Sequence, residues 1–222
     1  MAERDAIQPD RRTILLGAGL LALAGCTGGT RADYAAPTGR LLGADYETGI
    51  YDERHFIPPI EPGSLPLRYH RQDVADPTGE KPGTIVVRTD TRFLYLVRPG
   101  GRAIRYGIGI GRAGFGWTGR AVVGGKRVWP RWRPPPEMIA REPRLAAYGG
   151  LADGQGAGPD NPLGARTLDL YSNGEDTLYR IHGSTDADAI GQAVSAGCVR
   201  MLNHDVIDLW RRVPKGTVVL VV

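Results

Sequence analysis

Residues 102–111, with the sequence RAIRYGIGIG, contain the pattern that most directly determines the fold class of this chain. Ile104, Tyr106, Ile108 and Ile110 recur at every second position, so a β-strand would place all four side chains on one face. The two glycines between the last three of them lie on the other face, where a neighbouring segment can approach the backbone closely. The stretch therefore predicts a strand with one buried face and one face against which another part of the chain packs.

Short apolar runs of the same kind continue to the end of the chain. Turn-forming residues separate them, including PGG at 99–101 and SNGED at 172–176. In AVVGGKRVW at 121–129, the glycine pair predicts the turn of a hairpin. With 32 glycines and 17 prolines, about seven such strands predict a mainly β domain of sandwich or barrel type with a few short helices. The runs are 84–88, 92–97, 121–129, 166–171, 177–182 and 217–222.

Two helices are predicted within this β framework. The longer one begins at Asn203, whose side chain can cap the first turn, and Asp205 is favourable near the positive end of the helix. The shorter one lies in PPPEMIARE at 134–142, where proline is tolerated in the first turn. The apolar face of the longer helix, spaced at i, i+3, i+4 and i+7, consists of Val206, Leu209, Trp210 and Val213.

The first 25 residues have the layout of an export signal. Arg11 and Arg12 precede an apolar run at 14–25, which is too short for a membrane-spanning helix of about 20 residues. The run ends in LAGC, which resembles the lipobox of bacterial lipoproteins and implies that lipid is attached to Cys26 and the chain cut before it. An ordinary signal cut nearby stays open, and so does the export route, because one arginine pair only loosely resembles a twin-arginine signal. We expect an exported protein, held to a membrane in the periplasm or cell envelope by lipid on Cys26.

Residues 26–82 are the predicted tether and extended arm, because they are rich in glycine, proline, alanine and charge and show little periodicity. Residues 83–222 then contain the folded domain. The formal net charge of +4 is spread along the chain without a Lys/Arg-rich run interleaved with aromatic residues, so no nucleic-acid partner is predicted. A mild positive excess suits attraction to a negatively charged cell wall, and a solvated basic surface explains it equally well.

The chain has two cysteines, Cys26 and Cys198. If Cys26 carries lipid it cannot form a disulfide with Cys198, and a lone cysteine in an exported protein is a candidate reactive thiol. A Cys26–Cys198 disulfide and a buried, inert thiol are the structural alternatives. A metal site would need three or four ligands, and one further cysteine with scattered histidines predicts neither a metal nor another cofactor. The histidines predicted to lie at the surface are His55, His70 and His204.

A histidine and two glycines give this thiol a chemical context. His182 ends the predicted strand 177–182 and lies 16 residues before Cys198. Cysteine attacks as thiolate, and at an ordinary pKa of about 8.5 only a small fraction is ionised at neutral pH, so a histidine within hydrogen-bond reach can act as its base. Gly183 and Gly197 let the backbone approach a substrate and direct amide N–H groups at a developing oxyanion. The residues alone thus predict an exported enzyme that transfers acyl groups through an activated cysteine.

Two motifs make a family resemblance specific. HGS at 182–184 and SAGCVRM at 195–201, together with Asp205, resemble the signature of the L,D-transpeptidase (YkuD-type) catalytic domain. The resemblance extends from Pro82 to Val222 and implies an L,D-transpeptidase (YkuD-like) β-sandwich as the catalytic domain, 83–222. Upstream stretches similar to sequences common in this family are PGTIVVRTDTRFLYLV at 82–97, WPRWRPPPEMI at 129–139 and GPDNPLGARTLDLY at 158–171.

The resemblance implies a role for each residue of these motifs. Cys198 would be the nucleophile and His182 the base, and the carbonyl of Gly183 would orient the imidazole as the third member of a triad. The amides around Gly197 and Cys198 would form the oxyanion hole, and Arg200 would position the substrate or the catalytic loop. Ser195, Trp132 and Asn161 complete the residues predicted to contact the substrate or the oxyanion, with packing as the alternative for Trp132 and a turn as the alternative for Asn161.

Three positions leave parts of this assignment open. Arg200 could instead form an ion pair with Asp205 or Asp208. Ala196 stands where the family often has histidine, so any auxiliary role of that side chain is lost while the triad is kept. Gly119 stands where a proline commonly follows the threonine, which puts the local shape of the loop in doubt rather than the chemistry.

The resemblance also implies a reaction. Members of the family cleave a peptidoglycan stem tetrapeptide after its third residue, release D-alanine and pass the acyl group from the thiol to an amine. The expected partners are peptidoglycan stem peptides, with a second stem or a wall-attached protein supplying the amine. Two alternatives stay open: water could resolve the same acyl-enzyme, as in an L,D-carboxypeptidase or an amidase that detaches a protein from the wall, or the chain could be a non-enzymatic peptidoglycan-binding lipoprotein.

Overall fold

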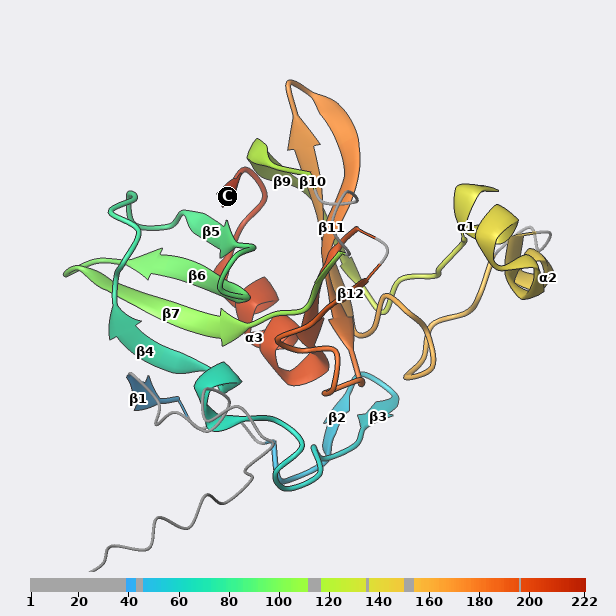
Figure 1. The fold of residues 1–222 in the computed structure, drawn as a ribbon, viewed down its shortest axis with the longest axis horizontal. Coiled ribbons are helices and arrows are strands. Elements are labelled where there is room, and N and C mark those ends of the chain that lie inside the picture. The colour runs from blue at the N-terminus through green and yellow to red at the C-terminus, as the bar shows by residue number, and fades with distance from the viewer. Residues whose placement is uncertain (1–38, 43–45, 112–116, 135, 150–153, 196) are drawn as a thin grey trace, which may run out of the picture. The chain divides into compact units, whose positions relative to one another are not determined.

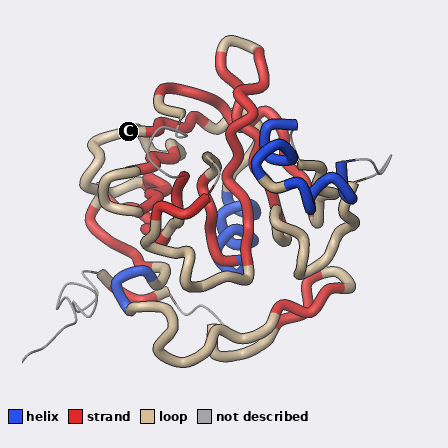
Figure 2. The backbone as a smooth tube through the Cα atoms, turned by 45° about the vertical axis from the view of Figure 1, so that its right-hand side comes forward, coloured by secondary structure: helices blue, strands red, loops and turns tan. Residues whose placement is uncertain are grey.

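Strands make up most of the regular structure, as Figure 2 shows. The computed structural model describes residues 39–42, 46–111, 117–134, 136–149, 154–195 and 197–222, all within the unit Arg31–Val222. Its helices are short: α1 (Pro136–Arg141), α2 (Ala146–Gly149), α3 (Asn203–Arg212) and two single turns of 3₁₀ helix at Leu67–Tyr69 and Pro143–Leu145. The predicted mainly β class with a few short helices is confirmed.

A large hydrogen-bonded sheet runs through the described residues, and two short strand pairs accompany it. The pairs are β2 (Ile50–Asp52) with β3 (His55–Ile57), and β8 (Ile110–Gly111) with β12 (Ala193–Ser195). In spatial order the large sheet consists of β1 (Arg40–Leu41), β4 (Gln72–Ala75), β7 (Arg102–Gly107), β6 (Phe93–Arg98), β5 (Ile85–Arg88), β14 (Val218–Val221), β9 (Gly119–Val128), β10 (Arg166–Ser172), β11 (Glu175–Ser184) and β13 (Val199–Leu202).

The C-terminal strand β14 joins the two halves of this sheet. It runs parallel to β5 and antiparallel to β9, and in Figure 1 the half from β4 to β7 and the half from β9 to β11 run in different directions. Buried apolar side chains of both halves and of α3 form a single cluster, so the halves pack on each other as the layers of a sandwich. Its fully buried members include Ile85, Val87, Leu94, Ile104, Tyr106, Val123, Leu168, Leu170, Ile181, Val199, Met201, Val206 and Leu209.

The stretch 102–111 behaves as its period of two predicts. Ile104, Tyr106 and Ile108 are fully buried in the shared core. On the opposite face, a Cβ at Gly107 would lie 2.6 Å from the Cβ of Tyr69, so only glycine leaves room for that segment. Strand β7 ends at Gly107, and β8 begins at Ile110. The partner of β8 is β12, the strand that precedes Cys198.

The hairpin predicted at 121–129 is wrong, because β9 continues through the glycine pair as one strand. Its neighbour β10 supplies the reason. A Cβ at Gly124 would collide with the ring of Tyr171, and the register between β9 and β10 shifts at Asp169 and Leu170. The glycines therefore make room for side chains of β10 across a bulge rather than forming a turn.

Helix α3 has the predicted apolar face but a different beginning. Val206, Leu209 and Val213 are buried in the core. Asn203 does not cap the helix, which has no side-chain cap bond at its N-terminus; instead Asn203 Oδ1 accepts a hydrogen bond of 2.8 Å from the main-chain N–H of Ala165. This tertiary bond replaces the local one because Asn203 already lies inside the helix. The short helix predicted at 134–142 is present as α1.

Part of the predicted arm belongs to the folded sheet. Strand β4 pairs with β7 along its whole length, and β1 pairs with β4. The hydroxyl of Tyr46 donates a hydrogen bond of 2.7 Å to Asp205 on α3, and the Arg71 guanidinium lies 3.1 Å from Asp208 on the same helix. These contacts attach residues 46–75 directly to the helix that follows the Cys198 segment.

The hairpin β2–β3 is attached through a buried ion pair. Arg166 donates two hydrogen bonds to the carboxylate of Asp52, one of 2.6 Å and one of 2.9 Å, and Trp129 Nε1 donates another of 2.9 Å. Both members of the pair are buried. Such a pair holds its partners in one geometry, because removing either side would leave an uncompensated charge in the interior.

The predicted export signal and Cys26 lie outside the described residues. Across the part of the chain that is described, the structure has no helix of the length and apolar character that a membrane crossing needs.

Candidate active site

The strands β11 and β13 bring the predicted histidine and cysteine to one sheet face. They run parallel, with Ile181 opposite Val199 and His182 opposite Arg200. Ile181 and Val199 are fully buried in the core, so His182 and Arg200 face the other way. Cys198 directly precedes β13, and continuing the alternation of that strand back by one residue puts Cys198 on the same face.

The ring of His182 is held in one tautomer by its own neighbour in the chain. The buried imidazole donates a hydrogen bond of 2.9 Å from Nδ1 to the carbonyl of Gly183. Because a carbonyl oxygen only accepts, the proton must be on Nδ1, which leaves the lone pair of Nε2 for a proton acceptor. Burial lowers the pKa of His182 to about 4; the Gly183 bond opposes this shift and the charge of Arg200 adds to it. At neutral pH His182 is therefore the uncharged base.

Gly183 must be glycine for a packing reason. A Cβ at this position would collide with Oδ1 of Asn203 and lie 3.0 Å from Cγ1 of Val206. The absent side chain lets β11 lie directly against α3, and the main-chain N–H of Gly183 donates to the carbonyl of Leu163 at 3.1 Å. These contacts fix the carbonyl that orients His182.

The thiol of Cys198 is half-buried. Burial raises its pKa above the ordinary value, while the main-chain N–H of Arg180 and the charges of Arg180 and Arg200 lower it and the charge of Asp169 raises it. With His182 uncharged and Cys198 protonated, the resting pair is neutral at pH 7. The disulfide alternative involves Cys26, which lies outside the described residues.

A series of glycines positions the segment that carries Cys198. Gly109 and Arg200 exchange two main-chain hydrogen bonds of 2.8 Å, which link the end of the β7–β8 segment to β13. A Cβ at Gly111 would lie 2.6 Å from the Cα of Gly197, and Gly197 itself has a φ of 138°, a conformation that side chains disfavour. The close approach predicted for Gly107 and Gly109 is confirmed, with Tyr69 against Gly107 and the carbonyl of Ala189 against Gly109, while Gly197 lies against Gly111.

The structure describes one of the two positions where this chain departs from the family motif. Ala196 lies outside the described residues, and Ser195 is described only as a backbone position of β12 that pairs with Gly111. Gly119 has a φ of 137°, whereas proline fixes φ near −65°. A proline could not adopt this backbone, so the conformation at this position depends on the glycine.

Arg200 does not pair with either aspartate of α3. Its guanidinium lies 3.4 Å from Asp186, in the loop before β12. Asp205 instead accepts from Tyr46, and Asp208 accepts from Tyr106 and Arg212. The alternative of an ion pair with Asp205 or Asp208 is therefore wrong, and the observed pair joins β13 to the loop between β11 and β12.

Trp132 and Asn161 both have structural contacts. Trp132 is buried, packs near the ring of Tyr148 at 6.1 Å and exchanges main-chain hydrogen bonds with Gln155. The Asn161 amide donates to the carbonyls of Pro130 and Gly156 at 2.9 and 2.8 Å and accepts from the N–H of Leu163, the residue that binds Gly183. Their predicted contacts with substrate stay predictions.

Sequence reasoning missed several polar residues around the site. His204, predicted to be exposed, is buried. Thr167 lies directly opposite His182 on β10, is fully buried, and its hydroxyl has no hydrogen-bond partner among the described residues. Arg180 lies two residues before His182 and shares its face. The period of two in 177–182 was the available signal for Arg180, whereas Thr167 follows only from strand pairing.

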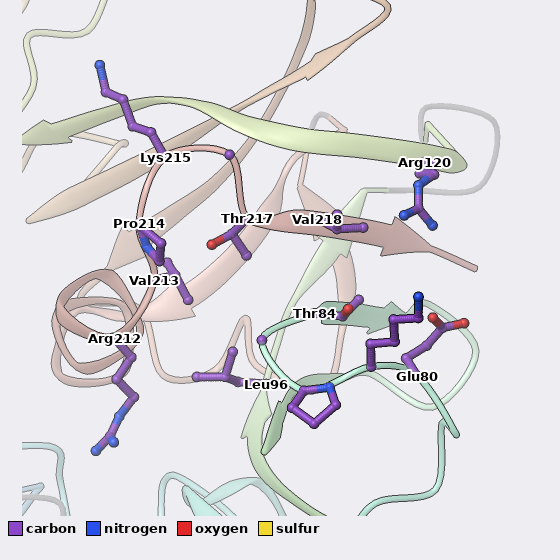
Figure 3. Close-up of a pocket in the computed structure, with 14 residues that line it drawn as sticks. Glu80, Thr84, Leu96, Arg120, Arg212, Val213, Pro214, Lys215, Thr217 and Val218 are labelled. Atoms are coloured by element: carbon purple, nitrogen blue, oxygen red, sulfur yellow. The ribbon is translucent and has the colours of Figure 1, made fainter. Parts of the chain in front are cut away.

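A cavity of 690 Å³ lies elsewhere (Figure 3). It is lined by the segment Glu80–Thr84, the end of α3, the start of β14 and two further side chains, and none of its residues comes from β11 or β13. Arg212 and Lys215 extend in opposite directions in this view. The cavity therefore shares no residue with the His182–Cys198 face.

In the described part of the chain, no group of three or more His, Cys, Asp or Glu side chains could hold a metal ion.

Comparison with known proteins finds one family repeatedly. The family model described as the L,D-transpeptidase catalytic domain, YkuD, matches residues 82–221. "Probable L,D-transpeptidase YbiS" of Escherichia coli K12 is 32% identical over 182 residues, which are 78% of this chain and 56% of that protein. "Probable L,D-transpeptidase ErfK/SrfK" of the same organism is 35% identical over 147 residues, 62% of this chain and 43% of that protein. The chain thus spans about half the length of these curated relatives.

One solved structure is more similar in sequence. A crystal structure described as a probable carnitine operon oxidoreductase from Brucella melitensis is 45% identical to this chain. It covers 66% of this chain and 89% of its own, with a TM-score of 0.48.

Proposed function

The chain belongs to the L,D-transpeptidase (YkuD) catalytic domain family, and we propose that it is a peptidoglycan L,D-transpeptidase that works through a thioester on Cys198. The observation that carries the proposal is the hydrogen bond from His182 Nδ1 to the Gly183 carbonyl. It leaves Nε2 of an uncharged imidazole free to accept a proton, and the alternation of β13 puts Cys198 on the same face. The names of the relatives support the reaction class.

Acylation would begin with proton transfer. His182 Nε2 takes the thiol proton as the sulfur attacks the carbonyl carbon of the third residue of a stem tetrapeptide. The amide N–H groups around Gly197 and Cys198 stabilise the oxyanion. His182 then returns the proton to the nitrogen of the leaving D-alanine, the C–N bond breaks, and a thioester remains.

Transfer reverses these roles on a second substrate. An acceptor amine attacks the thioester carbonyl, His182 Nε2 takes a proton from the amine, and the thiolate leaves and recovers that proton. The new amide bond joins the acyl group to the acceptor. Because the resting pair is neutral, the proton moves together with the attack and does not wait in a preformed thiolate–imidazolium pair.

Arg200 fits the role of positioning the catalytic loop. Its main chain is bonded to Gly109 and its guanidinium to Asp186, so it links both sides of the segment that carries Cys198. We place the substrate beside it because its side chain is partly exposed on the same face as His182 and Cys198.

Incubation of the protein with defined disaccharide tetrapeptides, with products identified by mass, tests the function. Transpeptidation gives dimers with a 3→3 link and free D-alanine. Tripeptide alone would mean that water resolves the acyl-enzyme, and the protein would then be an L,D-carboxypeptidase. Retention of the unchanged tetrapeptide with a reactive thiol would contradict the enzymatic proposal and favour a peptidoglycan-binding lipoprotein.

We also propose that the mature protein is anchored in the cell envelope by lipid on Cys26. The support is the LAGC sequence at the end of an apolar run that follows Arg11 and Arg12. Mass spectrometry of the N-terminal peptide of protein purified from membranes should find Cys26 at the new terminus with diacylglycerol on its sulfur. An unmodified Cys26 or a Cys26–Cys198 disulfide would contradict the anchor.

A further inference from the structure

A partly buried arginine, Arg180, lies near the thiol on the outer face of the β11–β13 pair. The register places His182 opposite Arg200, and continuing it by two residues along both strands places Arg180 beside Cys198. The main-chain N–H of Arg180 hydrogen bonds to the thiol, which supports this placement. The Arg180 side chain is only 14% exposed, so its charge acts on the thiol through protein more than through water.

Two carboxylates hold the Arg180 guanidinium in place. Asp176 accepts two hydrogen bonds from it, of 2.6 and 2.7 Å, and Asp169 Oδ1 lies 2.9 Å from its Nε. Asp169 is shared, because the Arg127 guanidinium also donates to it at 2.8 Å. This cluster of two arginines and two aspartates joins β9, β10 and β11. Its hydrogen bonds hold the Arg180 guanidinium in one position, whereas an arginine without such partners would be flexible.

Charged and titratable groups from β10, β11 and β13 lie near enough to Cys198 to act on its charge. Arg180 and Tyr179 come from β11, Asp169 from β10 and Arg200 from β13. Burial raises the pKa of Tyr179 to about 12, and the charge of Cys198 adds to that shift, so Tyr179 stays uncharged at neutral pH. The thiol thus has two positive neighbours and one negative neighbour, and the negative one is bound to Arg180.

We propose that Arg180 is a positioning residue that favours the thiolate form of Cys198 through its main-chain N–H and its guanidinium, and that Asp169 limits this effect by partly neutralising the guanidinium. The role in catalysis rests on the proposed function, in which negative charge develops on the sulfur as it attacks. Arg180 acts on the thiol and makes no contact with substrate in this role. The two side chains are therefore expected to act on the thiol in opposite directions.

The test measures alkylation of Cys198 by iodoacetamide between about pH 6 and pH 10. The full-length protein is used, and the peptide that contains Cys198 is quantified by mass, which separates it from Cys26. Arg180→Gln should slow alkylation below the thiol pKa by about three- to tenfold and move the profile to higher pH, because one nearby positive charge is lost. Asp169→Asn should accelerate it and move the profile to lower pH.

Arg127→Gln is the matched control, because it removes the other arginine bound to Asp169 without removing a group that faces Cys198. Its alkylation profile should stay within about twofold of the unmodified protein. Arg180→Lys, which keeps the charge, should restore most of the rate. Unfolding midpoints of all four variants show whether each one is folded.

Opposite shifts for Arg180→Gln and Asp169→Asn support the proposal, since general loosening of the site would move both variants in the same direction. An unchanged profile for Arg180→Gln, or shifts of one sign in both variants, would overturn it. Alkylation needs no peptidoglycan, so a protein that shows the opposite shifts but yields no 3→3 dimer would contradict the proposed function and leave the effect of Arg180 on the thiol intact.

Discussion

The Cys198→Ala variant is expected to form neither 3→3 dimer nor tripeptide from a stem tetrapeptide, a loss on the order of 10⁴-fold or more. The sulfur is the atom that would carry the acyl group, so no other residue of the triad can replace it. Cys198 is half-buried and alanine is smaller, so the unfolding midpoint should change little. The measurement is the rate of product formation by mass, with circular dichroism to confirm the fold.

Two matched variants sharpen this result. Cys198→Ser keeps the shape but presents a hydroxyl, whose proton an imidazole with a pKa near 4 removes poorly, so its activity should also be nearly lost. Cys26→Ser removes the other thiol and should keep full activity on soluble muropeptides, because Cys26 has no role in the chemistry. Product formation by Cys198→Ala at a substantial fraction of the normal rate would end the thioester mechanism.

The sequence predicted the strands well where one face is apolar and the other is not. Ile104, Tyr106 and Ile108 are buried because a strand places every second residue on one side. The same reasoning failed at Gly124 and Gly125. A glycine pair indicates a turn only when no neighbouring side chain needs the space that a Cβ would occupy. Here Tyr171 and Asp169 of β10 occupy that space, and no local pattern in 121–129 reveals them.

The predicted helix cap was wrong for a related reason, and the strand at 72–75 was not recognised for the same reason. Asn203 is a strong N-cap residue in isolation, yet its oxygen is bound by Ala165, 38 residues away in sequence. Residues 72–75 carry no strong strand pattern, and their place in the sheet comes from pairing with β7. In both cases a tertiary partner outweighs a local preference.

The residues of the candidate site that lie within a single sequence motif could be predicted. His182, Gly183, Gly197 and Cys198 follow from residue chemistry and family resemblance together, and the His182–Gly183 bond joins neighbours in the chain. The groups that tune the thiol did not follow, because Asp169 and Arg180 meet Cys198 only through the pairing of β10, β11 and β13. The spatial order of the strands in this sheet differs from their order in the chain, so spacing in the sequence does not reveal which strands are neighbours.

Replacing His182 should separate the role of the base from that of the nucleophile. His182→Ala is expected to lower the rate of 3→3 dimer formation by about 10²- to 10⁴-fold, the range that a positioned general base contributes. The thiol is kept, so alkylation of Cys198 should still occur, but only as fast as the thiol ionises unaided. Its rate should then rise about tenfold per pH unit up to the raised thiol pKa.

The pH profile of the unmodified enzyme gives the complementary result. Burial lowers the pKa of His182 to about 4, and a base works in its unprotonated form. Activity should therefore persist as the pH falls from 7 through the ordinary histidine range and should decline only as His182 becomes protonated near pH 4. His182→Gln, which keeps a similar volume, controls for packing and should be as inactive as the alanine variant. An acid limb of the activity profile with a midpoint near 6.5 would mean that the imidazole is solvated during turnover. In the alkylation experiment, an unchanged rate for His182→Ala near neutral pH would show that His182 is not the base of Cys198.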